Sequence, residues 1–164
     1  YRDKAMLSLM LVCGLRDIEI NRANAGDLQV KEGSFSLLVH GKGRDRRIPV
    51  RNDVAFYFIE CCKDKGIGEP VFFSKDAASR GGRLSTRGIR LVVDKYLNLA
   101  GLKSKGVSCH ALRHTAATML YRYTHDLLVV QNLLGHVDPK TTAKYAKVVE
   151  SEILDGLNLI PINV

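Results

Sequence analysis

The 164-residue sequence contains no tryptophan and only four prolines and four cysteines. The cysteines, Cys13, Cys61, Cys62 and Cys109, form no C-x-x-C pair, and adjacent cysteines seldom bond to each other. This usage excludes a disulfide framework and predicts reduced, mostly buried thiols in a cytoplasmic protein. No apolar run approaches the roughly 20 residues that a membrane helix needs, and no stretch resembles a signal peptide. We therefore expect no membrane partner.

Negative charge is also scarce, because 17 acidic residues face 25 basic ones and leave a formal net charge of +8. Such an excess favours a polyanionic partner, since it speeds and strengthens encounters with phosphates. Charge alone is equally compatible with a merely basic soluble protein. The apolar share of 46% and the length fit one globular domain with a hydrophobic core.

Hydrophobic periodicity predicts a single α+β unit, mostly helical, with a small three-stranded antiparallel sheet beside a helical bundle. Asn52 or Asp53 is expected to cap the third helix and Gly66 to end it, while Ser85 or Thr86 caps the fourth. Polar turns separate the three strands. The expected helices are 2–13, 16–21, 52–65, 87–100, 109–124, 126–134, 138–147 and 150–158, and the expected strands are 27–30, 34–40 and 47–50.

The stretch SCHALRHTAATML places His110, Arg113 and His114 on one face of a helix. Two histidines at this spacing hold zinc in H-E-x-x-H proteases, but here Ala111 replaces the glutamate. The permanent charge of Arg113 would repel a dication, so anion binding is the better interpretation, although Cys109 keeps a zinc site open as an alternative. His114 precedes small residues that suit close helix packing, so we expect it to serve the core or bond to backbone. His125 is expected at the surface.

Three further motifs, each taken alone, are weak evidence for a functional site. GLRDIE allows a surface ion pair between Arg16 and Glu19, HGKGRDRRIPV allows a soluble hairpin tip, and LLGHVDPKTTAKYAKV allows a helix cap and a packed tyrosine. All of them occur together with HALRH, in this order, in one basic chain. That combination is much less expected by chance.

The combination resembles the catalytic domain of the tyrosine site-specific recombinases, a family that includes phage and transposon integrases. The resemblance covers nearly the whole chain, and the pairing of H-x-L-R-H with L-G-H-x8-Y is specific. It implies a catalytic domain over residues 1–164, with the family's N-terminal DNA-clamping domain outside this chain. The catalytic positions that it implies are Arg16, Lys42, His110, Arg113, His136 and Tyr145.

The resemblance implies a site-specific recombinase that cleaves and rejoins DNA through a 3′-phosphotyrosine on Tyr145, without a metal, cofactor or ATP. Arg16 and Arg113 would hold phosphate oxygens with planar, permanently charged forks. His110 and His136 would add hydrogen-bond donors, and Lys42 would protonate the leaving 5′-oxygen. Glu19 would orient Arg16 or nearby backbone amides, since it cannot usefully approach a phosphate.

Other basic residues are expected to contact the DNA backbone, which positions a duplex without reading its sequence. They are Arg44, Arg46, Arg47, Arg80, Arg83 and Arg87. The implied partners are double-stranded DNA with specific recombination sites, three further copies of the protein in a homotetramer on DNA, and accessory DNA-bending proteins. The setting would be the bacterial nucleoid, with a mobile-element integrase favoured.

Two alternatives share much of this pattern. A type IB topoisomerase uses the same constellation, and a non-catalytic DNA-binding module could retain the fold. The size and the TTAKY context favour the recombinase, and competent residues at all six positions argue against the inactive module. The apolar tail 151–164 is expected to pack either onto a neighbouring protomer or back onto its own domain.

Overall fold

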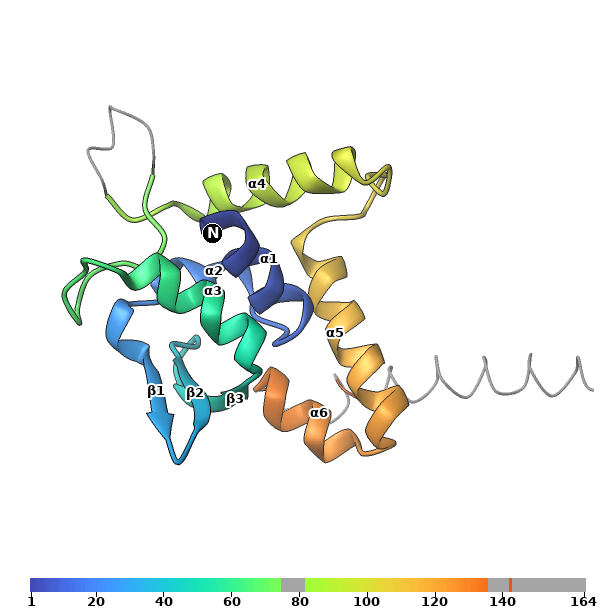
Figure 1. Cartoon of the computed structure of the whole chain (residues 1–164). Helices are drawn as coiled ribbons and strands as arrows, with labels where there is room; N and C mark the ends of the chain where they lie inside the picture. The colour runs from blue at the N-terminus through green and yellow to red at the C-terminus, as the bar shows by residue number, and fades with distance from the viewer. Residues whose placement is uncertain (75–81, 136–141, 143–164) are drawn as a thin grey trace, which may run out of the picture.

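The chain folds as a set of helices around a central helix, with a small sheet on one side (Figure 1). The structure is a computed structural model, which describes residues 1–74, 82–135 and 142. Its elements are α1 (Arg2–Leu11), α2 (Asp17–Arg22), the 3-10 helix η1 (Ala25–Asp27), β1 (Leu28–Lys31), β2 (Ser34–Val39), β3 (Arg46–Val50), α3 (Asn52–Cys62), α4 (Thr86–Leu99), α5 (Cys109–Thr124) and α6 (Leu127–Leu134). This architecture confirms the predicted mostly helical α+β class.

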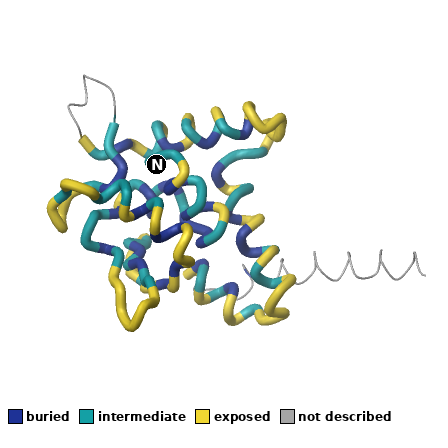
Figure 2. The backbone as a smooth tube through the Cα atoms, in the orientation of Figure 1, coloured by how far each residue is buried: buried dark blue, intermediate teal, exposed yellow. Residues whose placement is uncertain are grey.

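Helix α1 forms the centre of the core. Ala5, Met6, Leu9 and Met10 are all 0% exposed, because α1 packs against both α3 and α5. Figure 2 accordingly shows buried backbone concentrated in the middle of the molecule and exposed backbone at the loops. Burying long apolar side chains in this way is the main favourable contribution to folding.

The sheet is an antiparallel meander in the order β1-β2-β3, as predicted. Leu37 at its centre pairs with Leu28 on one side and Ile48 on the other. Alternate residues of β2 and β3 point into the core, including Leu37, Val39, Ile48 and Val50. The register therefore fixes where the loop between β2 and β3, residues 40–45, leaves the sheet.

Most helix boundaries agree with the sequence, and α5 occupies the predicted residues 109–124. Ser85 caps α4 by accepting a hydrogen bond from the Gly88 amide. The expected N-cap of α3 was wrong, because Arg51 takes that position and not Asn52 or Asp53. The expected end was also wrong, because the helix ends at Cys62, where Lys63 turns to ψ 133°. The predicted helices 138–147 and 150–158 lie outside the described residues. Within the described part of the chain, no helix combines the length and apolar character needed to span a membrane.

Helix α5 ends without the glycine that favours a left-handed cap. His125 takes that conformation instead, with φ 51° and ψ 24°, and its amide donates to the Tyr121 carbonyl at 2.7 Å. A non-glycine residue in this region carries some backbone strain. The predicted surface position of His125 is confirmed.

Candidate functional site

The turn between α1 and α2 presents Arg16. Gly14, in the turn after α1, has φ +66°, and a Cβ there would lie 2.8 Å from Leu134 Cδ2, so both the conformation and the space require glycine. Arg16 follows as the N-cap of α2 in an extended conformation. Its side chain remains 39% exposed, so its guanidinium can meet a ligand.

Glu19 lies at the centre of a cluster of arginines. It accepts hydrogen bonds from the Arg16 amide at 2.8 Å, from Arg16 Nη1 at 3.1 Å and from Arg46 Nη1 at 2.7 Å, and Arg113 Nη1 lies 3.8 Å away. Burial by itself raises the pKa of Glu19, but the bonds from Arg46 and Arg16 and the charge of Arg113 outweigh it and hold the pKa below its ordinary value. Glu19 is therefore a fixed anion that orients three guanidinium groups.

Arg113 projects from α5 into the interior, where its side chain is 7% exposed. It donates to the carbonyl of Gly14 and, through Nη2 at 2.8 Å, to the carbonyl of Leu134. His110, one turn earlier on α5, is exposed, and it borders a small hollow together with Arg16 and Arg113. The structure thus brings together three of the predicted catalytic residues from α2 and α5.

Arg46 at the start of β3 has all three of its nitrogens in internal hydrogen bonds. Nη1 and Nη2 bind the two oxygens of Glu19 at 2.7 and 3.3 Å, and Nε donates to the Leu133 carbonyl at 2.9 Å. A Cβ on Gly135 would lie 2.8 Å from Arg46 Cδ, so the turn after α6 rests directly on this side chain. Arg46 therefore has an internal role that the sequence did not predict, and its predicted DNA contact stays a prediction.

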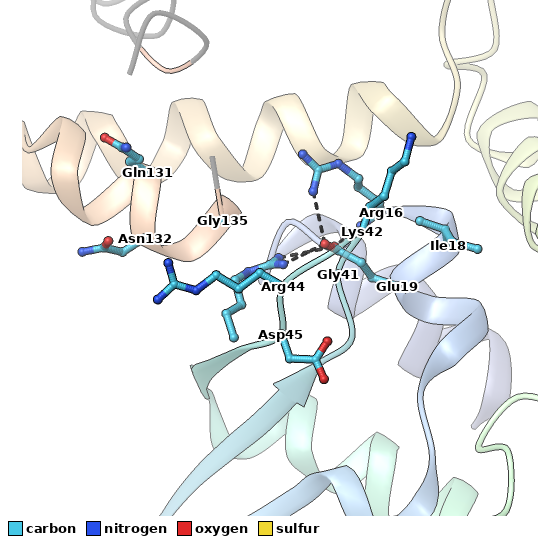
Figure 3. A pocket seen from close by; sticks show the side chains of 11 residues that line it. Arg16, Ile18, Glu19, Gly41, Lys42, Arg44, Asp45, Gln131, Asn132 and Gly135 are labelled. Atoms are coloured by element: carbon cyan, nitrogen blue, oxygen red, sulfur yellow. Dashed lines mark hydrogen bonds and ion pairs between the residues drawn. The ribbon is translucent and has the colours of Figure 1, made fainter. Parts of the chain in front are cut away.

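These groups border an open cleft of about 840 Å³ (Figure 3). Its lining comes from α2, the 40–45 loop and the end of α6, and includes Arg16, Lys42, Arg44 and Gly135. Arg16 and Lys42 both border this cleft, and Figure 3 shows the Arg16 guanidinium turned towards Glu19. Four basic and two acidic side chains line the cleft, which gives it the electrostatic character of an anion site.

The loop that carries Lys42 is attached to its surroundings. Arg22 Nη1 donates to the carbonyls of His40 and Gly41, and the His40 ring lies between Asp27 and Asp45. His40, Asp27 and Asp45 were not among the site residues predicted from the sequence. The contact between His40 and Asp45 could have been expected, because a hairpin brings together the residues on either side of its tip.

The other predicted DNA-binding arginines divide into two groups. Arg44, Arg47 and Arg87 are exposed and remain candidates for phosphate contacts. Arg83 is not free for this role, because it donates to the carbonyls of Asn21 and Ala23 and to Asn24 Oδ1, which ties the segment before α4 to the end of α2. The three remaining predicted site residues, Arg80, His136 and Tyr145, lie outside the described residues.

Two further expectations concern histidines and metals. Of the two expectations for His114, the core position was wrong, because this residue of α5 is exposed. For the zinc alternative, the described residues contain no group of three or more His, Cys, Asp or Glu side chains placed to hold a metal ion. Burial raises the pKa of Cys109, with the charge of Asp17 adding to the effect, so its thiol is not poised as a thiolate ligand.

Comparisons with known proteins agree with this arrangement. A profile of the phage integrase family matches residues 1–152. The chain is 36% identical to a tyrosine recombinase XerC of Caldanaerobacter subterraneus subsp. tengcongensis, over 99% of this chain and 46% of that protein.

Solved structures show the same fold. A XerH recombinase bound to palindromic difH substrate in a post-cleavage complex superposes with a TM-score of 0.79 at 22% identity, over 96% of this chain and 45% of that one. A XerA recombinase superposes with a TM-score of 0.71 at 26% identity, over 88% of this chain and 52% of that one. The chain spans about half the length of the relatives that it matches. With its fold, its arginine cluster and its sequence all in agreement, the chain belongs to the phage integrase family of tyrosine recombinases.

Proposed function

We propose that this chain is the catalytic part of a site-specific recombinase that cleaves and rejoins double-stranded DNA through a 3′-phosphotyrosine on Tyr145. The observation that carries the proposal is that Arg16 lines both the basic cleft that Lys42 borders and the small hollow that Arg113 borders, so that three distant segments bring cations to adjoining surfaces. XerC is named as a tyrosine recombinase, and the XerH complex is described as post-cleavage on its difH substrate. Both relatives support DNA strand exchange as the activity.

In the proposed reaction the phenolic oxygen of Tyr145 attacks a backbone phosphorus and the bond from phosphorus to the 5′-oxygen breaks. Arg16 and Arg113 hold the nonbridging oxygens, whose negative charge increases in the transition state. Lys42 gives its proton to the departing 5′-oxygen, and the proton of the attacking phenol passes to His110 or His136. Attack by a 5′-hydroxyl reverses these steps and restores the tyrosine, so the bond energy is retained in the protein–DNA ester and rejoining needs no ATP.

The geometry of the cluster suits this role. Arg113 is fixed by two backbone carbonyls and Arg16 by Glu19, so neither guanidinium must reorganise when charge develops on the phosphate. His110 stands beside both arginines as a further donor, and His136 is proposed to act from the turn after α6, which Gly135 begins. Permanent cations then supply the charge stabilisation that this mechanism requires, so it includes no metal step.

A nicked suicide duplex tests the proposal. Such a substrate loses its 5′-end after cleavage, which traps the covalent intermediate. The chain in its full-length context should become attached to the 3′-phosphate, and Tyr145→Phe should not. Covalent attachment by the Tyr145→Phe protein, or none by the wild type on its bound site, would contradict the mechanism.

The wider assignments stay proposals as well. They are an N-terminal DNA-clamping domain outside this chain, a homotetramer on paired sites, accessory DNA-bending proteins and a place at the bacterial nucleoid as a mobile-element integrase. Relaxation of supercoils by a monomer, without paired sites, would favour the type IB topoisomerase alternative. Deletion of residues 151–164 that leaves synapsis unchanged would exclude docking of the tail on a neighbouring protomer.

A further inference from the structure

The loop between β2 and β3 is closed by one side chain. His40, where β2 ends, directs Nδ1 at Asp45 Oδ2 at 2.8 Å and Nε2 at Asp27 Oδ1 at 3.1 Å. Asp45 directly precedes β3, so the imidazole joins the two ends of the loop that carries Lys42. We call His40, Asp27 and Asp45 the His40 clip.

The two carboxylates of the clip differ in rigidity. The side chain of Asp27 is 9% exposed and its Oδ2 accepts the Asn24 amide at 2.7 Å, which fixes it to η1. The side chain of Asp45 is 50% exposed and is bound to His40. Asp27 is thus the anchor, and His40 is the link that holds the far end of the loop to it.

We propose that His40 is a positioning residue for Lys42, and that its doubly protonated ring keeps the 40–45 loop closed beside the Arg16 cleft. The inference rests on the proposed role of Lys42 as the proton donor. A side chain at a hairpin tip can take many positions, and a misplacement of about 1 Å lowers a reaction rate by roughly a hundredfold. A closed loop reduces that freedom and keeps Lys42 at the cleft that Arg16 also borders.

Protonation decides whether the clip is complete. A neutral imidazole has one N–H and can donate to only one of the two carboxylates, whereas the imidazolium donates to both. Burial by itself lowers the pKa of His40, but the hydrogen bonds to Asp45 and Asp27 outweigh it, so the pKa lies above its ordinary value of 6.5. The charged groups that face this region are Asp27, Asp45 and Arg22, which contacts the His40 carbonyl.

The raised pKa of His40 fixes how the clip responds to pH. Because folding raises the pKa of His40, the clip is complete at low pH and is lost as the pH rises through the folded value. The positioning of Lys42 should weaken over the same interval. Arg22 binds the backbone of His40 and Gly41 independently of the imidazole, so the first part of the loop stays attached while the Asp45 end is released.

A leaving group that needs no proton separates this effect from general damage. Cleavage is measured in the full-length protein on an ordinary duplex and on one with a 5′-bridging sulfur, whose thiolate departs unprotonated. We expect His40→Gln to slow ordinary cleavage roughly 10- to 100-fold and to leave thiolate cleavage within about twofold of wild type. Lys42→Ala is the positive control, and His125→Gln, at an exposed position outside the cleft, controls for the loss of one histidine side chain.

Each outcome decides a separate question. Equal slowing on both substrates, or no slowing on either, would overturn the role of His40. If the 5′-sulfur substrate restores cleavage by Lys42→Ala but not by His40→Gln, the positioning role of His40 is overturned and Lys42 remains the proton donor. Failure to rescue Lys42→Ala would remove Lys42 from that role and the His40 inference with it, whereas the covalent Tyr145 complex would still test the recombinase itself.

A pH series adds a second measurement. In wild type, the ratio of ordinary to thiolate cleavage should fall as the pH rises above about 6.5, because the clip opens. In His40→Gln this fall in the ratio should be absent, since the glutamine amide does not titrate. A step of the same size in both proteins would contradict the inference.

Discussion

The guanidinium of Arg46 binds both carboxylate oxygens of Glu19, with Nη1–Oε1 at 2.7 Å and Nη2–Oε2 at 3.3 Å. The two residues come from β3 and α2, and the same guanidinium reaches the Leu133 carbonyl at the end of α6. This pair therefore links the sheet, the turn that presents Arg16 and the turn that leads to His136. Arg46 itself lines the cleft, so the same side chain both borders the cleft and holds its walls together.

The Arg46–Glu19 pair should show strong energetic coupling. In a double-mutant cycle with Arg46→Met and Glu19→Leu, measured by urea unfolding, we expect an interaction free energy of about 0.5–3 kcal/mol, because each single change leaves the other charge buried. Arg47→Met on the exposed side of β3 is the control and should be nearly neutral. Additive effects of the two changes would contradict the coupling.

The stability of the fold should depend on pH through Glu19. Its folded pKa lies below the ordinary value of 4.5, so its ion pairs contribute fully above that value and are lost as the pH falls through the folded value. Wild type should therefore lose free energy of unfolding below pH 4.5, and Glu19→Gln should lose less over the same interval while being less stable at pH 7. Urea unfolding at pH 3 to 7 measures this, and parallel curves for the two proteins would exclude Glu19 as the source.

Arg113→Lys should remove most DNA cleavage. An ammonium cannot donate to the Gly14 and Leu134 carbonyls and also present a planar fork to a phosphate, so we expect a loss of roughly 10²- to 10³-fold in the cleavage rate. Single-turnover formation of the covalent complex measures it. Arg51→Lys, at an exposed position before α3, should cleave normally, and a wild-type rate for Arg113→Lys would exclude its proposed role.

Gly14→Ala should destabilise the domain. A left-handed conformation costs a non-glycine residue about 1–2 kcal/mol, and the new Cβ would also press on Leu134. Gly33→Ala is the matched control, since Gly33 has φ +77° but open space around it. Thermal or urea unfolding should rank wild type above Gly33→Ala and Gly33→Ala above Gly14→Ala. Equal losses for the two variants would show that the contact with Leu134 is unimportant.

The two groups of arginines should differ in how they affect DNA binding. Arg44→Gln should reduce the slope of log K against log salt by about 1, as the loss of one phosphate contact does. Arg83→Gln should leave the slope unchanged and lower stability, because its side chain holds Asn21, Ala23 and Asn24. Binding titrations at several salt concentrations distinguish these results, and a changed slope for Arg83→Gln would return it to the DNA-contacting group.

Local patterns in the sequence were sufficient for most of the fold. The apolar spacing in 109–124 predicted α5 to the residue, and alternation between polar turns predicted the meander. The end of α3 was missed because Lys63 leaves the helix well before the glycine that seemed to end it. The exposure of His114 was missed because small neighbours indicate close packing but do not say which side of the helix is packed.

The site was harder to predict wherever a side chain finds its partner across the chain. Spacing places Arg16 beside Glu19, and the structure shows that contact. No local pattern connects Arg46 to Leu133, or Arg83 to Asn24, so both arginines looked like surface cations. His40 was missed for the same reason, since its partner Asp27 belongs to a different element.

The two carbonyls that hold Arg113 have a consequence for synthesis on the ribosome. Gly14 leaves the ribosome before Arg113, but Leu134 leaves it afterwards. Until Leu134 has emerged, the guanidinium lacks one of its two backbone acceptors. The placement of Arg113 on which the proposed strand cleavage depends is therefore completed only after α6 has been synthesised.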